Sequence, residues 1–205
     1  MGLELFDEDE ASRLAWDIDR PQRELIRLTE DHQIKGRVLE LGCCSGENML
    51  YLASKGLEVW GIDASPAAIA RGKRKVEHRG IKATFCLGDP ARIRELGQTF
   101  DVVLDFGFFH TIWDDDKRFT FANALPSILS IGGIYYLLCF NEYEPAEWGA
   151  SCRITQKDIQ RIFGEGWKIK RIRRATFDTS VHKDGGQAWL ATILREWEPQ
   201  KAGTL

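Results

Sequence analysis

The residues best suited to chemistry lie between positions 37 and 63, where a turn of small residues is followed by a carboxylate. The turn, Gly42-Cys43-Cys44-Ser45-Gly46, comes directly after the apolar run Val38-Leu39-Glu40-Leu41. Asp63 lies about 20 residues further on, at the end of a second apolar run, and a carboxylate in that place can accept hydrogen bonds from ribose hydroxyls. This spacing predicts a nucleotide site at the carboxyl ends of two neighbouring strands.

Two common kinds of nucleotide site fit the turn poorly. A dinucleotide site has glycines in the pattern GxGxxG, because the backbone must come close to a pyrophosphate. Counted from Gly42, those positions hold Gly42, Cys44 and Glu47, and the carboxylate of Glu47 would repel a pyrophosphate. A P-loop is excluded because no Gly-Lys-Ser/Thr sequence follows the turn.

The stretch resembles the first motif of the class I S-adenosylmethionine-dependent methyltransferases, here LELGCCSG, with GIDAS as the ribose-binding segment. The resemblance implies S-adenosylmethionine as the cofactor and S-adenosylhomocysteine as its product. It also implies a set of cofactor-binding residues, most of them in loops that follow strands: Trp16, Glu40, Gly42, Cys43, Gly46, Asp63, Ala64, Asp89, Pro90 and Asp105.

The resemblance assigns each part of this set to one part of the cofactor. The turn takes the methionine end, and Glu40 orders that loop or the cofactor amine. Asp63 takes the ribose, Asp89 the adenine, and Asp105 the amino group of the methionine moiety. Trp16, in the segment WDIDRPQ, has two open interpretations. It is an aromatic face near the sulfonium, within an N-terminal lid, or an aromatic plug at the end of the sheet.

Cys44 occupies a position where the family usually has glycine. Two interpretations are open: its side chain crowds the cofactor, or the backbone has a negative φ at which cysteine is tolerated. Because of the first interpretation, a protein that binds S-adenosylmethionine without transferring its methyl group stays an alternative to the enzyme.

The segment DFGFFHTI follows an expected strand at Phe100–Asp105. It lacks the Asn/Asp-Pro-Pro-aromatic motif of the amino-methylating enzymes. It resembles the thiopurine and halide/thiol methyltransferase branch, in which an aspartate, a small residue and a histidine follow this strand. The resemblance makes His110 the candidate catalytic residue, which would bind or deprotonate a thiol. A buried, hydrogen-bonded structural histidine is the other open interpretation.

The methyl acceptor is expected to lie near the loop 141–153, with Phe108, Trp148 and Arg153 as substrate residues. Two interpretations of this loop are open: a cap over the substrate or an ordinary surface loop. The leading hypothesis is transfer of a methyl group to a small-molecule soft nucleophile, a thiol, selenol or halide. Such a reaction needs little beyond a dry, aligned pocket. Methylation of oxygen or nitrogen on a small metabolite is the alternative within the enzymes. No motif addresses the oligomeric state.

The elements that must position these residues form one α/β domain over residues 1–205, with a helical lid segment at 1–35. The expected fold is a Rossmann-like, doubly wound, seven-stranded sheet, mostly parallel, with a C-terminal antiparallel hairpin. Strands are expected over 38–41, 57–62, 82–87, 100–105, 134–140, 167–177 and 187–197. Ser65 and Pro66 are expected to start a helix, and Asp116 to cap a longer one over 117–129, kinked at Pro126.

Composition narrows the function classes. A net charge of −3 argues against a nucleic-acid partner, so basic residues on the outer face of the helix at 67–79 are expected to be solvated. No apolar run approaches the ~20 residues of a membrane span. Five cysteines without CxxC spacing indicate a reducing, cytoplasmic location, and the scattered histidines give no metal site.

Overall fold

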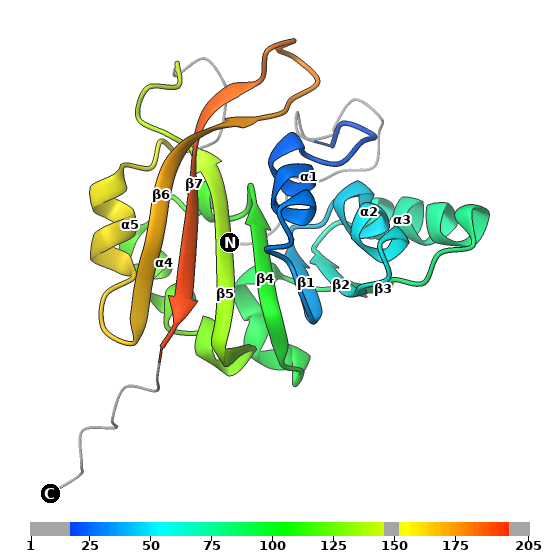
Figure 1. Ribbon diagram of the computed structural model, residues 1–205, viewed down its shortest axis with the longest axis horizontal. Helices are drawn as coiled ribbons and strands as arrows, with labels where there is room; N and C mark the ends of the chain where they lie inside the picture. The colour runs from blue at the N-terminus through cyan, green and yellow to red at the C-terminus, as the bar shows by residue number, and fades with distance from the viewer. Residues whose placement is uncertain (1–16, 146–151, 197–205) are drawn as a thin grey trace, which may run out of the picture.

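The computed structural model describes residues 17–145 and 152–196. Its centre is a seven-stranded sheet in the order β3-β2-β1-β4-β5-β7-β6 (Figure 1). The strands are β1 (Arg37–Leu41), β2 (Glu58–Asp63), β3 (Thr84–Leu87), β4 (Phe100–Phe106), β5 (Leu129–Phe140), β6 (Trp167–Phe177) and β7 (Gly186–Arg195). The α-helices are α1 (Arg23–Glu30), α2 (Glu47–Ser54), α3 (Pro66–Arg79), α4 (Asp115–Ala122) and α5 (Gln156–Ile162). Short 3-10 helices are η2 (Pro90–Leu96), η3 (Phe109–Thr111) and η4 (Leu125–Ser127).

The pairing of the strands confirms the expected fold class. Strands β1 to β5 pair with one another in parallel. Strand β7 runs antiparallel between β5 and β6, which leaves β6 at one edge of the sheet. Because the parallel strands end on the same side, the loops that follow β1, β2 and β4 meet at one edge, where ligands bind in doubly wound sheets.

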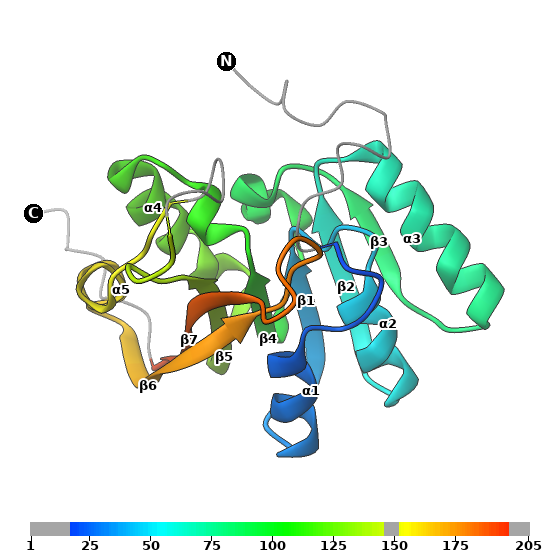
Figure 2. The same ribbon diagram turned by 90° about the horizontal axis from the view of Figure 1, so that it is seen from above.

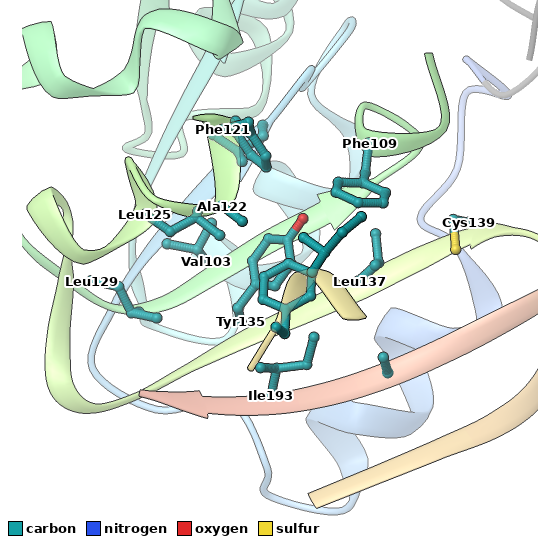
Figure 3. Close-up of a cluster of buried hydrophobic side chains, with 14 of the residues drawn as sticks. Val103, Phe109, Phe121, Ala122, Leu125, Leu129, Tyr135, Leu137, Cys139 and Ile193 are labelled. Carbon is teal, nitrogen blue, oxygen red and sulfur yellow. The ribbon is translucent and has the colours of Figure 1, made fainter. Parts of the chain in front are cut away.

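The sheet is covered on both faces, and each face has its own hydrophobic core. One core joins Leu25 of α1, Met49 of α2 and Ile69 of α3 to the sheet. The other joins α4 and α5 to the opposite face, with Phe121 and Tyr135 fully or almost fully buried (Figure 3). Figure 2 shows α4 and α5 together on one side, with α1 and α2 on the other. Two buried faces explain why the inner strands are apolar throughout rather than alternating.

The expected start of α3 is confirmed, and α5 also begins with a local cap. The Ser65 side chain accepts a hydrogen bond from the backbone N–H of Ala68, and Pro66 occupies the first position of α3. Thr155 and Asp158 form a reciprocal capping box at the start of α5.

The expected helix over 117–129 is wrong in its cap and in its length. Asp114, not Asp116, caps α4 by accepting a hydrogen bond from the backbone N–H of Lys117. The helix ends at Ala122, and Pro126 lies in the separate 3-10 helix η4 rather than in a kinked continuation. Proline lacks the N–H that an α-helix interior needs, so the chain leaves the helix before it and enters β5 at Leu129.

Within 17–145 and 152–196, no helix combines the length and the apolar character that a membrane crossing requires. The same residues contain no group of three or more histidine, cysteine or acidic side chains arranged to hold a metal ion.

Candidate active site

The turn after β1 is held by backbone hydrogen bonds to the neighbouring strand. The N–H groups of Gly42 and Cys43 both donate to the carbonyl of Ile62, over 2.9 and 3.1 Å. Gly46 starts α2 with a φ of +81°, and a Cβ atom there would lie 2.4 Å from the ring of Phe85. Only glycine combines this conformation with so close an approach. The turn thus forms a cradle at the N-terminus of α2.

Cys44 adopts the left-handed conformation, with a φ of +49°. The suggestion that its backbone has a negative φ is therefore wrong, and cysteine stands in a conformation that favours glycine. The Cys44 N–H donates to Asp63 Oδ2 over 2.8 Å, which fixes the backbone in this shape. Its side chain is buried at the pocket wall, and burial raises the pKa of the thiol.

Asp63 connects the turn to the loop after β2. Its Oδ2 accepts from Cys44, and its Oδ1 accepts from the backbone N–H of Ser65 over 2.8 Å. Burial raises the pKa of Asp63, and these two donors oppose the rise. A carboxylate has about four acceptor positions, so Asp63 can still accept hydrogen bonds from a ribose, a role that stays a prediction.

A pocket of about 330 Å³, counting the part open to solvent, lies over the cradle. Its walls come from the turn, from Glu40 and Phe106 at the ends of β1 and β4, from the first turn of α2, and from segment 17–22. The structure therefore brings Glu40, Gly42, Cys43 and Gly46 together at one pocket, as expected.

Glu40 is an acidic residue that borders the pocket and yet is almost fully buried, with 3% of the residue exposed. Its Oε1 accepts a hydrogen bond from Asn48 Nδ2 over 2.6 Å. Among the described residues its Oε2 has no hydrogen-bond partner. Burial raises the pKa of Glu40 to about 8; the hydrogen bond from Asn48 opposes the rise, and the charge of Asp63 adds to it. A buried oxygen without a partner suits a ligand that brings a cationic N–H donor.

Two basic residues of α3, Arg71 and Lys75, are half-buried against the turn and not solvated as expected. Arg71 forms an ion pair of 3.1 Å with Asp17, which also accepts a hydrogen bond from the Ser45 hydroxyl over 2.6 Å. Lys75 bonds to the Ser45 hydroxyl and pairs with Glu47. The basic side chains therefore hold segment 17–22 against the turn. No local sequence pattern predicts these contacts, because they join residues far apart in the chain.

Asp105 holds the loop that follows β4. It is fully buried, and its Oδ1 accepts from the N–H groups of Phe108 and Phe109, while its Oδ2 accepts from the Tyr135 hydroxyl over 2.8 Å. Burial raises its pKa to about 6, against these donors. The carboxylate is directed at its own loop and at Tyr135, so it orders the loop after β4. Its contact with a cofactor amine stays a prediction.

His110 is fully buried, with its ring stacked on Phe140 at 4.8 Å and 5° between the planes. The Phe140 N–H donates to His110 Nδ1 over 3.1 Å, which places the proton of the neutral ring on Nε2. Burial lowers the pKa of His110 to about 3, helped by the charges of Arg153 and Arg118. Such an imidazole cannot take a proton from a thiol near neutral pH, so the deprotonating role does not fit. The substrate-binding role stays a prediction.

The remaining candidates are spread over the same edge of the sheet. The Phe108 side chain lies beside Gly42, 3.5 Å from the position a Cβ atom would take there. Arg153 donates from Nε to the Glu144 carbonyl over 2.9 Å and lies over the Phe140 ring, so it braces the part of the cap loop that is described. Trp16 and Trp148 lie outside the described residues.

The adenine end of the expected site is less enclosed. Asp89 is half-buried and caps η2 by accepting from the Ala91 N–H over 2.8 Å, and the buried Pro90 begins that helix. Ala64 follows Asp63 and is half-buried. None of these three borders the pocket described above, and their contact with adenine stays a prediction.

Comparisons with known proteins agree with this geometry. Residues 38–133 match the model of a methyltransferase domain family. An uncharacterized methyltransferase of Schizosaccharomyces pombe is 33% identical over 118 residues, which are 58% of this chain and 79% of that protein. The 2-heptyl-1-hydroxyquinolin-4(1H)-one methyltransferase of Mycobacteroides abscessus is 26% identical over 91% of this chain and 83% of its own length.

A solved structure described for the conversion of a disulfide bond into a thioacetal group during echinomycin biosynthesis has a TM-score of 0.80 and 27% identity. The match covers 92% of this chain and 86% of the other. The glycine cradle at the end of β1, the acid at the end of β2, the strand order and these relatives lead to one conclusion: the chain belongs to the class I S-adenosylmethionine-dependent methyltransferases.

Proposed function

We propose that this methyltransferase acts on a small molecule and transfers the methyl group to a soft nucleophile, a thiol, selenol or halide. When bound, S-adenosylmethionine supplies an electrophilic methyl group on a sulfonium sulfur. The cradle of Gly42, Cys43 and Gly46 would hold its methionine end, and Glu40 Oε2 would accept from its ammonium group. Asp63 would accept from the ribose hydroxyls.

The observation that carries the acceptor class is the state of His110. A thiol with a pKa around 8.5 is roughly 3% ionised at pH 7 without any help. Its thiolate would attack the methyl carbon and displace S-adenosylhomocysteine: a new C–S bond would form as the sulfonium C–S bond breaks, and the electron pair of the broken bond would go to the leaving sulfur. An alcohol needs a base to lose its proton. His110 is poorly placed to be that base, because it is fully buried, its Nδ1 already accepts from the Phe140 N–H, and burial lowers its pKa.

Two similarities support different acceptors. The structure described for the change of a disulfide into a thioacetal concerns chemistry at sulfur, in line with the leading proposal. The Mycobacteroides abscessus relative is named for a hydroxyquinolone, so methylation of an acidic hydroxyl group on an aromatic ring is the second candidate. Such a hydroxyl also ionises without a strong base, and it fits the same property of His110.

The test compares aromatic thiols with the matching hydroxyl compounds, with S-adenosylhomocysteine release as the readout. If the acceptor ionises by itself, log kcat/KM rises with slope one up to the acceptor's own pKa. The His110→Asn variant, which keeps an acceptor for the Phe140 N–H, then retains the same pH profile. The proposal would be overturned if the pH dependence of kcat/KM were set by the pKa of an enzyme group and were lost in His110→Asn. Faster turnover of the hydroxyl compounds would select the second candidate, and cofactor binding without product would leave only a binding protein.

A further inference from the structure

Asn48 occupies a position at which its amide contacts two different parts of the molecule. On one side its Nδ2 donates to Glu40 Oε1 over 2.6 Å. On the other its Oδ1 accepts from the backbone N–H of Gln22 over 2.8 Å. An amide has a donor end and an acceptor end, so these two contacts fix its orientation. Asn48 also borders the pocket above the cradle.

Gln22 continues this connection away from the pocket. Its side-chain amide pairs with the backbone of Asp178: Gln22 Nε2 donates to the Asp178 carbonyl over 3.0 Å, and the Asp178 N–H donates to Gln22 Oε1 over 2.8 Å. Both residues are almost fully buried, with Gln22 4% and Asp178 1% exposed. The pairing reproduces the hydrogen bonds that two adjacent strands would make.

The carboxylate of Asp178 secures the same junction. It accepts from Arg20 Nη1 over 3.1 Å, from the Arg23 N–H over 2.9 Å and from Arg23 Nε over 2.7 Å. Burial alone would raise the pKa of Asp178, but these donors lower it. Figure 2 shows the loop between β6 and β7 lying beside the segment that leads into α1. Segment 17–22 is therefore anchored to this loop at one end and to the pocket by Asn48.

We propose that Asn48 is a positioning residue: it orients Glu40 toward the methionine end of the cofactor and, through the same amide, couples cofactor binding to the docking of segment 17–22. The inference rests on the proposed role of Glu40 toward the cofactor ammonium. It assigns Asn48 no contact with the reacting atoms. Because Glu40 Oε1 is taken by Asn48, Oε2 is the oxygen left to face a ligand. A ligand that draws charge onto Glu40 strengthens the hydrogen bond from Asn48, and the strengthened amide holds the Gln22 N–H more firmly.

Three variants separate this role from a general loss of packing. Asn48→Ala removes both contacts. Asn48→Asp keeps the shape and the acceptor for Gln22 but replaces the donor to Glu40 by a second carboxylate. Asn48→Ser is a smaller change, for use if alanine disturbs folding. Asn123→Asp is the matched control, because Asn123 is exposed at the end of α4.

The first measurement is calorimetric titration with S-adenosylhomocysteine between pH 6 and 9. Asn48→Ala and Asn48→Asp should each weaken binding about tenfold or more, as expected for the loss of a hydrogen bond to a charged group. The pH at which affinity reaches its plateau should rise, since the bond from Asn48 favours the ionised form of Glu40. A merely structural role would lower affinity equally at every pH. Asn123→Asp should match the wild type.

A double-mutant cycle with Glu40→Gln then tests the coupling directly. The affinity of the double variant for S-adenosylhomocysteine should be no more than about twofold below that of the single variant with the lower affinity, because both changes break the same interaction. Hydrogen exchange should show that ligand slows exchange at the Gln22 amide in the wild type and less so in Asn48→Ala. Independent, multiplying effects, or an unchanged pH profile, would overturn the role of Asn48 while leaving the cofactor site intact. Failure of the wild type itself to bind would overturn the proposed site and this inference together.

Discussion

Replacing Glu40 by glutamine should make the ligand-free enzyme less sensitive to pH. The folded-state pKa of Glu40 is about 8, above its ordinary value of 4.5. Between these values the folded protein holds a proton that the unfolded chain releases, so the free energy of unfolding falls as pH rises. The fall is at most about 1.4 kcal/mol per pH unit and amounts to roughly 2 to 3 kcal/mol between pH 5 and pH 7. Glutamine does not titrate and escapes this loss.

Urea denaturation followed by circular dichroism at pH 5, 6 and 7 checks the prediction. The stability of Glu40→Gln relative to wild type should increase by about 2 to 3 kcal/mol across this range, which corresponds to roughly 4–12 °C in Tm. Any constant cost of the new amide cancels, because only the change with pH is compared. Glu77→Gln, on the exposed face of α3, is the matched control. Parallel curves for wild type and Glu40→Gln would show that Glu40 is not held protonated by its buried site.

The same substitution should weaken cofactor binding while it removes the loss of stability that the empty protein shows as pH rises. Glutamine offers no negative charge to the ammonium group, so binding of S-adenosylhomocysteine should fall by about tenfold or more at pH 8. If Glu40→Gln gains stability relative to wild type as pH rises and also loses affinity for S-adenosylhomocysteine, Glu40 is a buried acid whose ionisation costs stability in the empty protein and is compensated by the ligand. Equal binding by both proteins would remove Glu40 from the cofactor site.

Substitutions at two further positions test the interior of the site. Tyr135→Phe removes a donor to Asp105, whose pKa of about 6 should then rise; the variant should lose about 1.5–3 kcal/mol above pH 7 and much less near pH 5, as measured by denaturation at both values. Cys44→Val should destabilise by about 1–3 kcal/mol, because a β-branched residue strongly resists a positive φ, while Cys44→Gly should stay within about 1 kcal/mol of wild type. Equal stability of the valine and glycine variants would contradict the left-handed conformation at this position.

The sheet could be predicted from the sequence because its signals are local. The apolar runs that became β1 and β4 are bounded by turn residues. The segment that became β6 mixes basic and β-forming residues, and the structure keeps it at the expected Trp167–Phe177. The cap of α4 could not be chosen in the same way. Asp114, Asp115 and Asp116 are adjacent and chemically identical, so only packing of the helix decides which one lies at its start.

The turn and its acid could also be predicted, but their partners could not. Glu40 and Asp63 stand at the ends of strands, where a pattern places them. Asn48 and Gln22 are 26 residues apart, and Gln22 and Asp178 are 156 apart. Contacts at such separation depend on how the loops meet in space. The buried environment that keeps His110 neutral is likewise a property of the assembled fold, so the sequence left its two roles open.

The antiparallel insertion of β7 has a consequence for the order in which the chain can assemble. Strand β6 pairs with β7 but not with β5, so it has no place in the sheet until residues 186–195 have emerged from the ribosome. Strands β1 to β5 can pair before that point, with the edge of β5 exposed. The loop carrying Asp178 lies between β6 and β7, so the anchor for segment 17–22 forms only when this late insertion is complete. Segment 17–22, which is synthesised early, therefore docks only after the loop between β6 and β7, which is synthesised late. A nascent chain stalled before β7 should contain most of the sheet without a finished cofactor pocket.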